Sequence, residues 1–177
     1  MIETARLLLR SWRDEDVVPF NAINADPRVM ATLGPLQTLD ETAALVARMQ
    51  AINASCGHCF WAVECKADTA LFGWCGIVRG PEAAPIAGKP EIGWRLAYDY
   101  WGQGFACEAA QASLDWGFAN LPDDAIWAIT TPGNPRSWGL MERLKMRRHP
   151  NLDFNHPAVA EGSPLRAHRT YSIARPV

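Results

Sequence analysis

Hydrophobic residues in this chain gather in short runs that are separated by turn-forming residues. Runs of this kind, rich in branched and aromatic side chains, are typical of β-strands. Two of them flank Lys66-Ala67-Asp68, whose composition predicts a hairpin turn. The expected strands are residues 7–10, 60–64, 71–78, 91–97, 125–131 and 169–174.

Other segments repeat their hydrophobic residues at the spacing of a helix. Leu45, Met49 and Ile52 follow one another at intervals of four and three residues, which places them on one helical face. Thr38 and Glu41 have the form of a capping box before this stripe, and Gly57 is a stop signal after it. The other expected helices begin near residue 16 and end before 26, and cover 106–120 and 135–144.

The order of these elements predicts the fold class. Strand pairs come first, and single strands then alternate with helices, which indicates one mixed α/β domain spanning residues 1–177. Residues 80–90 hold three prolines and two glycines and are expected to form a loop.

Composition narrows the classes of protein. The chain is 49% hydrophobic and 20% charged, as globular proteins are, and its formal net charge of −2 gives no general attraction to nucleic acid. No apolar run is long enough to cross a bilayer. Glu3, Arg6 and Arg10 interrupt the N-terminal apolar residues, which argues against a secretory signal. We therefore expect a cytoplasmic protein with neither nucleic-acid nor membrane partners.

The chain has five cysteines, an odd number without a regular framework, which indicates reduced thiols. Cys56 and Cys59 form a Cys-x-x-Cys pair around His58, but no second pair at zinc-ligand spacing follows. The pair also precedes a strand, whereas redox pairs open a helix. We expect no metal site and no redox role.

The strongest chemical signal is a glycine-rich turn that leads into a helix. Residues 100–110 contain Gly102 and Gly104 directly before the alanine-rich segment 106–120. The first N–H groups of a helix lack internal partners and attract anions, so this turn suits a phosphate or pyrophosphate group. Taken alone, the same pattern also fits a plain turn.

Several segments together resemble a known family. They are Thr4-x-Arg6-Leu-x-Leu-Arg10, Glu91-Ile-Gly-Trp-Arg-Leu96, Tyr100-Trp-Gly-Gln-Gly-Phe-Ala-Cys-Glu-Ala109, Asn134-x-x-Ser137 and His156-Pro-x-x-x-Glu-Gly-x-Pro-Leu-Arg-x-His168. Found in this order over nearly the whole chain, they resemble the GNAT superfamily of acyl-CoA-dependent N-acetyltransferases, in the branch of the ribosomal-protein N-terminal-alanine acetyltransferases.

The resemblance implies a mixed, largely antiparallel sheet with flanking helices and a central strand pair that splays at a bulge near Gly93. It implies acetyl-CoA as cosubstrate. The pantetheine would pair with the backbone around Trp94, Arg95 and Leu96, and a backbone N–H near Trp94 would stabilise the oxyanion. The other implied cofactor-binding residues are Gln103, Gly104, Phe105, Ala106 and Cys107, whose amides would hold the pyrophosphate, and Asn134, which would orient the pantetheine or cap its helix.

The implied reaction is direct attack of a primary amine on the acetyl thioester. Glu91 is the candidate base, with a surface salt bridge as the rival role. Many relatives carry a tyrosine as acid where this chain has Met141, so Ser137 becomes the candidate partner of the thiolate, with helix capping as its rival role. The acceptor is a protein N-terminus or a small-molecule amine, and the alternative is a non-catalytic acyl-CoA sensor. The protein would be a monomer or homodimer.

Two positions depart from the family pattern. Trp101 stands where many relatives have Arg or Gln at the start of the glycine loop, which removes one side-chain partner for phosphate. Lys145 replaces the glycine that usually ends the last helix, so either Lys145 adopts the helix-end conformation or the helix ends differently.

Overall fold

The computed structural model describes residues 1–176. Its strands are β1 (Ile2–Glu3), β2 (Leu7–Arg10), β3 (Phe60–Cys65), β4 (Leu71–Arg79), β5 (Pro90–Leu96), β6 (Ala125–Thr130), β7 (Arg147–Arg148), β8 (Phe154–Asn155) and β9 (Ala167–Ala174). Its α-helices are α1 (Val17–Asn24), α2 (Pro27–Met30), α3 (Leu39–Cys56), α4 (Phe105–Asn120) and α5 (Pro135–Arg143). Short 3-10 turns cover Asp14–Asp16, Tyr98–Tyr100 and Pro150–Leu152.

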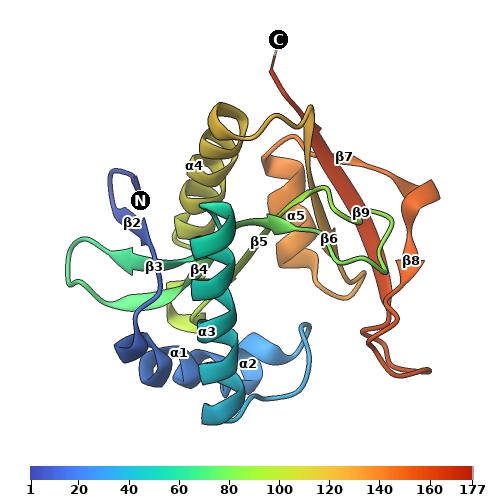
Figure 1. Ribbon diagram of the computed structural model, residues 1–177. Coiled ribbons are helices and arrows are strands. Elements are labelled where there is room, and N and C mark those ends of the chain that lie inside the picture. The colour runs from blue at the N-terminus through green and yellow to red at the C-terminus, as the bar shows by residue number, and fades with distance from the viewer. Residues whose placement is uncertain (177) are drawn as a thin grey trace.

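The strands form one open sheet in the order β1-β2-β3-β4-β5-β6-β9-β7, with β8 beside β9. All pairs are antiparallel except β5 and β6, which run parallel. The expected mixed, largely antiparallel sheet is thereby confirmed. In Figure 1 the strands up to β4 lie on one side of the molecule, and β6, β9 and β7 lie on the other.

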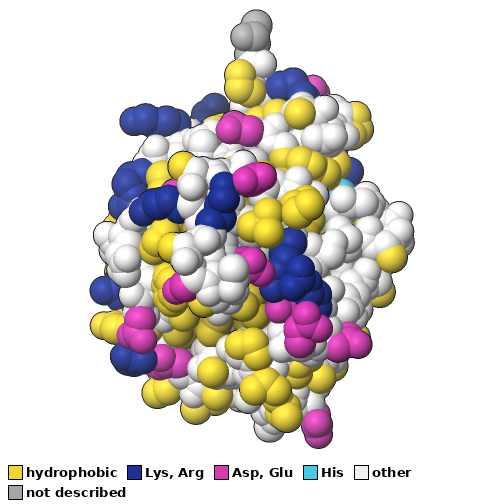
Figure 2. Space-filling model, turned by 90° about the vertical axis from the view of Figure 1, so that its left-hand side faces the viewer, with side chains coloured by type: hydrophobic (Ala, Val, Ile, Leu, Met, Phe, Trp, Pro, Cys, Tyr) yellow, Lys and Arg dark blue, Asp and Glu magenta, His cyan; other side chains and the backbone are white. Residues whose placement is uncertain are grey.

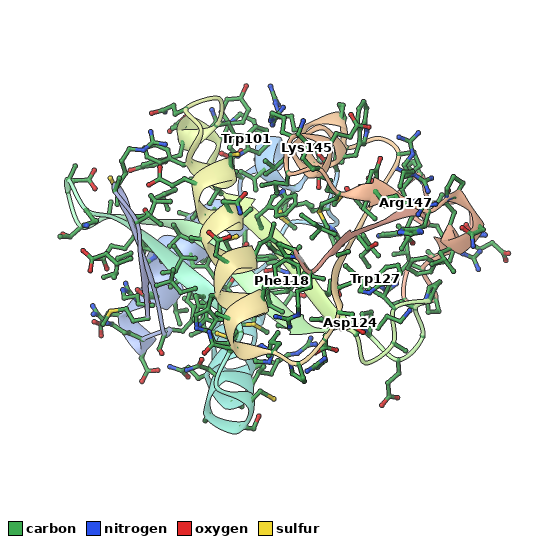
Figure 3. The ribbon with its side chains drawn as sticks, turned by 90° about the horizontal axis from the view of Figure 1, so that it is seen from above. Trp101, Phe118, Asp124, Trp127, Lys145 and Arg147 are labelled. Atoms are coloured by element: carbon green, nitrogen blue, oxygen red, sulfur yellow. The ribbon has the colours of Figure 1, made fainter. Side chains whose placement is uncertain are left out.

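The helices cover the two faces of this sheet. On one face α4 packs against β4, where Ser113 contacts Cys75, while α3 crosses the molecule on the other side (Figures 1 and 3). On the α3 face Arg10 is 6% exposed and donates hydrogen bonds to Asp16 and Glu64, which ties β2, β3 and the first helical turn together. The charges of this buried group are compensated within the fold.

The helix α4 approaches the sheet closely because one of its facing residues is glycine. A Cβ at Gly117 would lie 2.5 Å from Cδ1 of Ile77 and 2.7 Å from Cδ1 of Ile126. Ala109 and Ala110 are fully buried on the same helix. The small side chains predicted for this helix therefore set its distance from β4 and β6.

The predicted helix signals are confirmed. Thr38 and Glu41 form the reciprocal capping box of α3, and the helix ends at Gly57 in the left-handed conformation. Lys145 adopts the glycine-like helix-end conformation, with φ of 63°. Its N–H bonds the carbonyl of Glu142, and the Met146 N–H bonds that of Met141, which is the Schellman pattern.

The parallel pair β5–β6 is splayed. The ladder between β4 and β5 pairs seven residues, from Pro90 to Leu96, whereas β5 and β6 pair only at Glu91 and Trp127. Beyond that point the two strands separate, and α5 follows β6 on this side of the molecule (Figure 1). The expected splayed central pair is present.

The structure differs from the sequence predictions in two respects. The expected bulge at Gly93 is wrong, because the β4–β5 register runs through it without a shift. Instead a Cβ there would lie 3.1 Å from the rings of Phe60 and Trp74, so glycine permits a close approach. The sequence did not predict the strands β1, β7 and β8 or the helix α2. Each has four residues or fewer, which is too few to show a hydrophobic period.

The surface mixes both signs of charge. Figure 2 shows basic and acidic side chains interspersed among apolar patches on the face that it presents. None of the helices formed by residues 1–176 combines the length and apolar character that crossing a bilayer requires.

The close approach at Gly117 gives a prediction about stability. We expect Gly117→Val to lower the free energy of unfolding by ~1–3 kcal/mol, because its branched side chain overpacks the contact with Ile77 and Ile126. Gly117→Ala is the control: the δ-methyl groups can move aside, and alanine gains about 1 kcal/mol of helix propensity. Urea unfolding of both variants measures the difference, and equal stabilities would contradict this packing argument.

Candidate functional site

A cavity of about 870 Å³, the main cavity, opens where β5 and β6 separate. Its wall comes from β5, the glycine turn, the end of β6, the start of α5 and the segment after β8. The splay, the helix start and the Asn134 segment, which the resemblance assigned to one cofactor site, enclose one space. The predicted site residues in its lining are Glu91, Trp94, Arg95, Leu96, Gly104, Phe105, Ala106, Cys107, Asn134 and Ser137.

Gln103 is the predicted residue that does not line this cavity. Its side chain donates a hydrogen bond to the carbonyl of Asp99, and its own carbonyl accepts one from Arg6. Trp101 braces the same turn, since its indole N–H donates to the carbonyl of Leu96 at 2.8 Å. Figure 3 places Trp101 at the N-terminal end of α4 and Phe118 toward its other end.

One edge of β5 keeps backbone groups available in the cavity. Ala97 N–H bonds the Phe72 carbonyl, and with the β4–β5 register this directs the backbone of Glu91, Gly93 and Arg95 toward β4. The backbone of Trp94 and Leu96 alternates to the opposite side, where β6 has moved away. Of the backbone expected around Trp94 to Leu96, Trp94 and the Leu96 N–H therefore lie on the open edge. The Leu96 carbonyl accepts the Trp101 indole N–H, and Arg95 belongs to the ladder.

The start of α4 forms an anion cradle. Gly104 caps the helix with φ of 84° and no side-chain cap, and the first helical hydrogen bond is donated by Glu108 to Gly104. The N–H groups of Phe105, Ala106 and Cys107 therefore have no partner in the helix. Gly102, with φ of 74°, and Gly104 allow the turn to pass this helix end without side chains in the way.

Glu91 lies half-buried at the point where the strands separate. Burial raises the pKa of its carboxyl to about 7. Within residues 1–176 no Lys or Arg lies within salt-bridge distance of it, so the rival surface salt bridge is not formed. A carboxyl with this pKa exchanges protons readily at neutral pH.

The start of α5 supplies the remaining predicted groups. Asn134 caps the helix, because its side-chain oxygen accepts the N–H of Ser137 at 3.1 Å. The hydroxyl of Ser137 is not part of that cap and lines the cavity. Met141 lies on the same wall, 2% exposed, and presents no ionisable proton.

Several charged or titratable side chains in the wall of the main cavity were not predicted as site residues. Arg136 lies over the ring of Trp101, with its Cζ 4.8 Å from the ring centroid, and Arg143 follows two turns later on α5. His156 and His168, the two ends of the C-terminal segment that carries the resemblance, also line the cavity, and burial lowers the pKa of His168. No local signal assigned these four side chains to the site, because they meet only in the folded chain.

A second hollow of about 450 Å³, the side cavity, lies between α3 and the sheet. It shares Phe60, Trp74 and Arg95 with the main cavity, so the two adjoin. Among the described residues 1–176, no group of three or more His, Cys, Asp or Glu side chains is arranged to hold a metal ion.

Comparison with known proteins bears on this site. Residues 6–147 match the model of the acetyltransferase (GNAT) domain family. The uncharacterised protein YkkB of Bacillus subtilis is 33% identical over 144 residues, which are 81% of this chain and 83% of that protein. The crystal structure of a GNAT-family acetyltransferase from Bacillus anthracis shares 25% identity with a TM-score of 0.79 over 98% of each chain.

A solved ribosomal-protein α-N-acetyltransferase in complex with coenzyme A has a TM-score of 0.76 over 97% of this chain and 95% of its own. The identity is 14%, so this likeness shows the fold alone.

Proposed function

We propose a reaction for this chain from one premise: the chain belongs to the GNAT acetyltransferase domain family and is an acyl-CoA-dependent acetyltransferase. The reaction is transfer of the acetyl group of acetyl-CoA to a primary amine by direct attack, within a single N-acetyltransferase domain. The observation that carries it is the main cavity, in which an open strand edge, a helix N-terminus and a carboxyl of raised pKa meet.

The structure offers two fitting places for acetyl-CoA. The N–H groups of Phe105, Ala106 and Cys107 suit the pyrophosphate, with Gly104 leaving the approach clear and Gln103 closing the turn. The open backbone of Trp94 and the N–H of Leu96 suit the pantetheine amides, which would take the place of a strand. Arg136 adds a positive charge beside the turn. It could replace the phosphate partner that relatives with Arg or Gln at the position of Trp101 have.

The chain's own groups cover the remaining steps. Acetyl-CoA supplies the activated acyl group. Glu91, whose carboxyl ionises with a pKa of about 7, accepts a proton from the acceptor's ammonium group, and the neutral amine then attacks the thioester carbonyl. The Trp94 N–H donates to the carbonyl oxygen that gains charge. Ser137 donates to the departing sulfur, a role that a fall in the turnover of Ser137→Ala at unchanged acetyl-CoA affinity would support.

The proposed function also includes the kind of amine that accepts the acetyl group. A protein N-terminus follows from the branch resemblance, and a small-molecule amine follows from the side cavity, which lies partly under α3. We favour the small molecule, because a hollow between a helix and the sheet suits a compact acceptor. Met141, which cannot serve as a proton donor, supports the alternative of an acyl-CoA sensor without turnover.

An acceptor screen tests this function. The protein is incubated with acetyl-CoA and a panel of amines, amino acids, polyamines and peptides beginning with Ala or Ser, and release of free CoA is followed. We expect CoA release together with a product heavier by one acetyl group in mass spectrometry. Binding of acetyl-CoA without CoA release for any member of the panel would identify the sensor instead.

Gly104→Val tests the anion cradle. Valine strains the backbone at a φ of 84° and places a branched side chain at the helix end, so acetyl-CoA affinity should fall at least about tenfold in calorimetry. Gly162→Val is the matched control, since Gly162 has a similar φ of 81° and lies outside the cavity lining. Equal affinity in the two variants would refute the assignment.

Glu91→Gln tests the base. In the wild type, kcat/KM should decrease as the pH falls through about 7, because the protonated carboxyl cannot accept a proton. In Glu91→Gln we expect roughly a 10²-fold lower rate and loss of that acidic limb. Glu82→Gln, on an exposed loop, should keep the profile of the wild type. An unchanged limb in Glu91→Gln would assign the titration to another group.

A further inference from the structure

The side cavity has an apolar wall. The aliphatic side chains of Leu45, Met49 and Ile52 face it from α3, and Trp12 closes it near the N-terminal strand. Phe60 and Trp74 form its border with the main cavity, stacked with centroids 4.3 Å apart and an interplanar angle of 20°. A molecule with an apolar or aromatic body fits such a wall, since it removes this surface from water.

Two polar side-chain atoms of residues that line the side cavity are buried without a partner. They are Nε of Arg95 and the side-chain oxygen of Gln37. Buried polar groups in folded proteins are nearly always hydrogen-bonded. The Arg95 Nε–H is a donor, so it points to a ligand with an acceptor group, whereas the Gln37 oxygen is itself an acceptor and would need a donor.

Arg95 is a fixed cation without an anionic partner. Its Nη1 donates to the side-chain oxygen of Asn24 at 2.7 Å, and the Asn24 amide donates to Thr42, which holds the pair in place. Among residues 1–176 no carboxylate pairs with this guanidinium, and none lines the side cavity. Burial lowers the pKa of Arg95 to about 10, which leaves it charged at neutral pH. An uncompensated buried charge is costly, so an anion is its natural complement.

The position of Arg95 relates this charge to the reaction. Glu91, Gly93 and Arg95 are every second residue of β5, so they face the same side of the sheet. Four residues of extended strand separate the Cα atoms of Glu91 and Arg95 by about 13 Å. The stacked rings of Phe60 and Trp74 cover Gly93 between them. A carboxyl that accepts protons and a cation that binds anions thus lie at the two ends of one aromatic surface.

We propose that the acceptor is a small amino-carboxylate with an apolar or aromatic body, whose carboxylate binds Arg95 while its amine faces Glu91. This inference rests on the proposed function, which supplies the acetyl group and the proton acceptor. A polyamine would place a second cation beside Arg95, where like charges repel.

Matched acceptor pairs test the proposal. L-phenylalanine and 6-aminohexanoate are each compared with the corresponding carboxamide, and the readout is the ratio of kcat/KM between acid and amide. Because any change in acetyl-CoA binding affects both members alike, it cancels in this ratio. We expect Arg95→Gln to lower the ratio at least about tenfold. Arg95→Lys should lower it less, since lysine keeps the charge but lacks the paired N–H donors of the guanidinium.

Arg147→Gln is the control, because Arg147 is exposed and lies outside the lining of both cavities. It should keep the ratio of the wild type. Thermal melting verifies that each variant is folded. Unchanged ratios in both folded Arg95 variants, or faster transfer to polyamines or peptides than to every acid, would overturn the inference while leaving the acetyltransferase function intact.

A binding measurement separates the two proposals. Calorimetry with N-acetyl-L-phenylalanine and its amide, without acetyl-CoA, should show that the acid binds more tightly to the wild type and that Arg95→Gln removes the difference. If no amine is acetylated and the acid still binds through Arg95, the proposed function fails and the anion site stands. If the acid and the amide bind equally, the anion site fails.

Discussion

The single contact between β5 and β6 is the constraint from which the site follows. The sheet continues through Glu91 and Trp127 and then opens, so that one edge of β5 retains unpaired backbone groups inside the molecule. Exposed strand edges are usually paired or covered. Here the gap is bounded by the glycine turn, α4 and α5 instead, which makes it a cavity with donors and acceptors in its wall.

The packing of α4 on the sheet gives this cavity its charge. Because Gly117 lets the helix lie against Ile77 and Ile126, the helix axis is fixed relative to β5. Its N-terminus then lies beside the open edge, and the positive end of its dipole faces the cavity. The position of the α4 N-terminus beside the open edge of β5 thus depends on the contact of Gly117 with Ile77 and Ile126, which is made elsewhere along the helix.

Local signals predicted the parts of the fold whose causes are local. The capping box at Thr38, the stop at Gly57 and the cap at Asn134 depend on residues within a few positions, and the structure contains all three. The interpretation of Gly93 as a bulge was wrong because its neighbours Phe60 and Trp74 come from other strands. The sequence predicted Arg95 for its backbone alone, because the surroundings of its side chain arise only through tertiary contacts. The contact of Arg136 with Trp101 is tertiary in the same way. Lys145 lies between these cases, since the sequence posed two alternatives and its φ of 63° selects one.

The incomplete pairing of β5 also links ligand concentration to folding. Any molecule that occupies the open edge in place of a strand binds the native sheet and not the unfolded chain, so it draws the folding equilibrium toward the native state. The open edge of β5 exists only in the folded sheet, so the binding site disappears when the chain unfolds. The resistance of this protein to heat or proteolysis would therefore rise and fall with the supply of its own substrate.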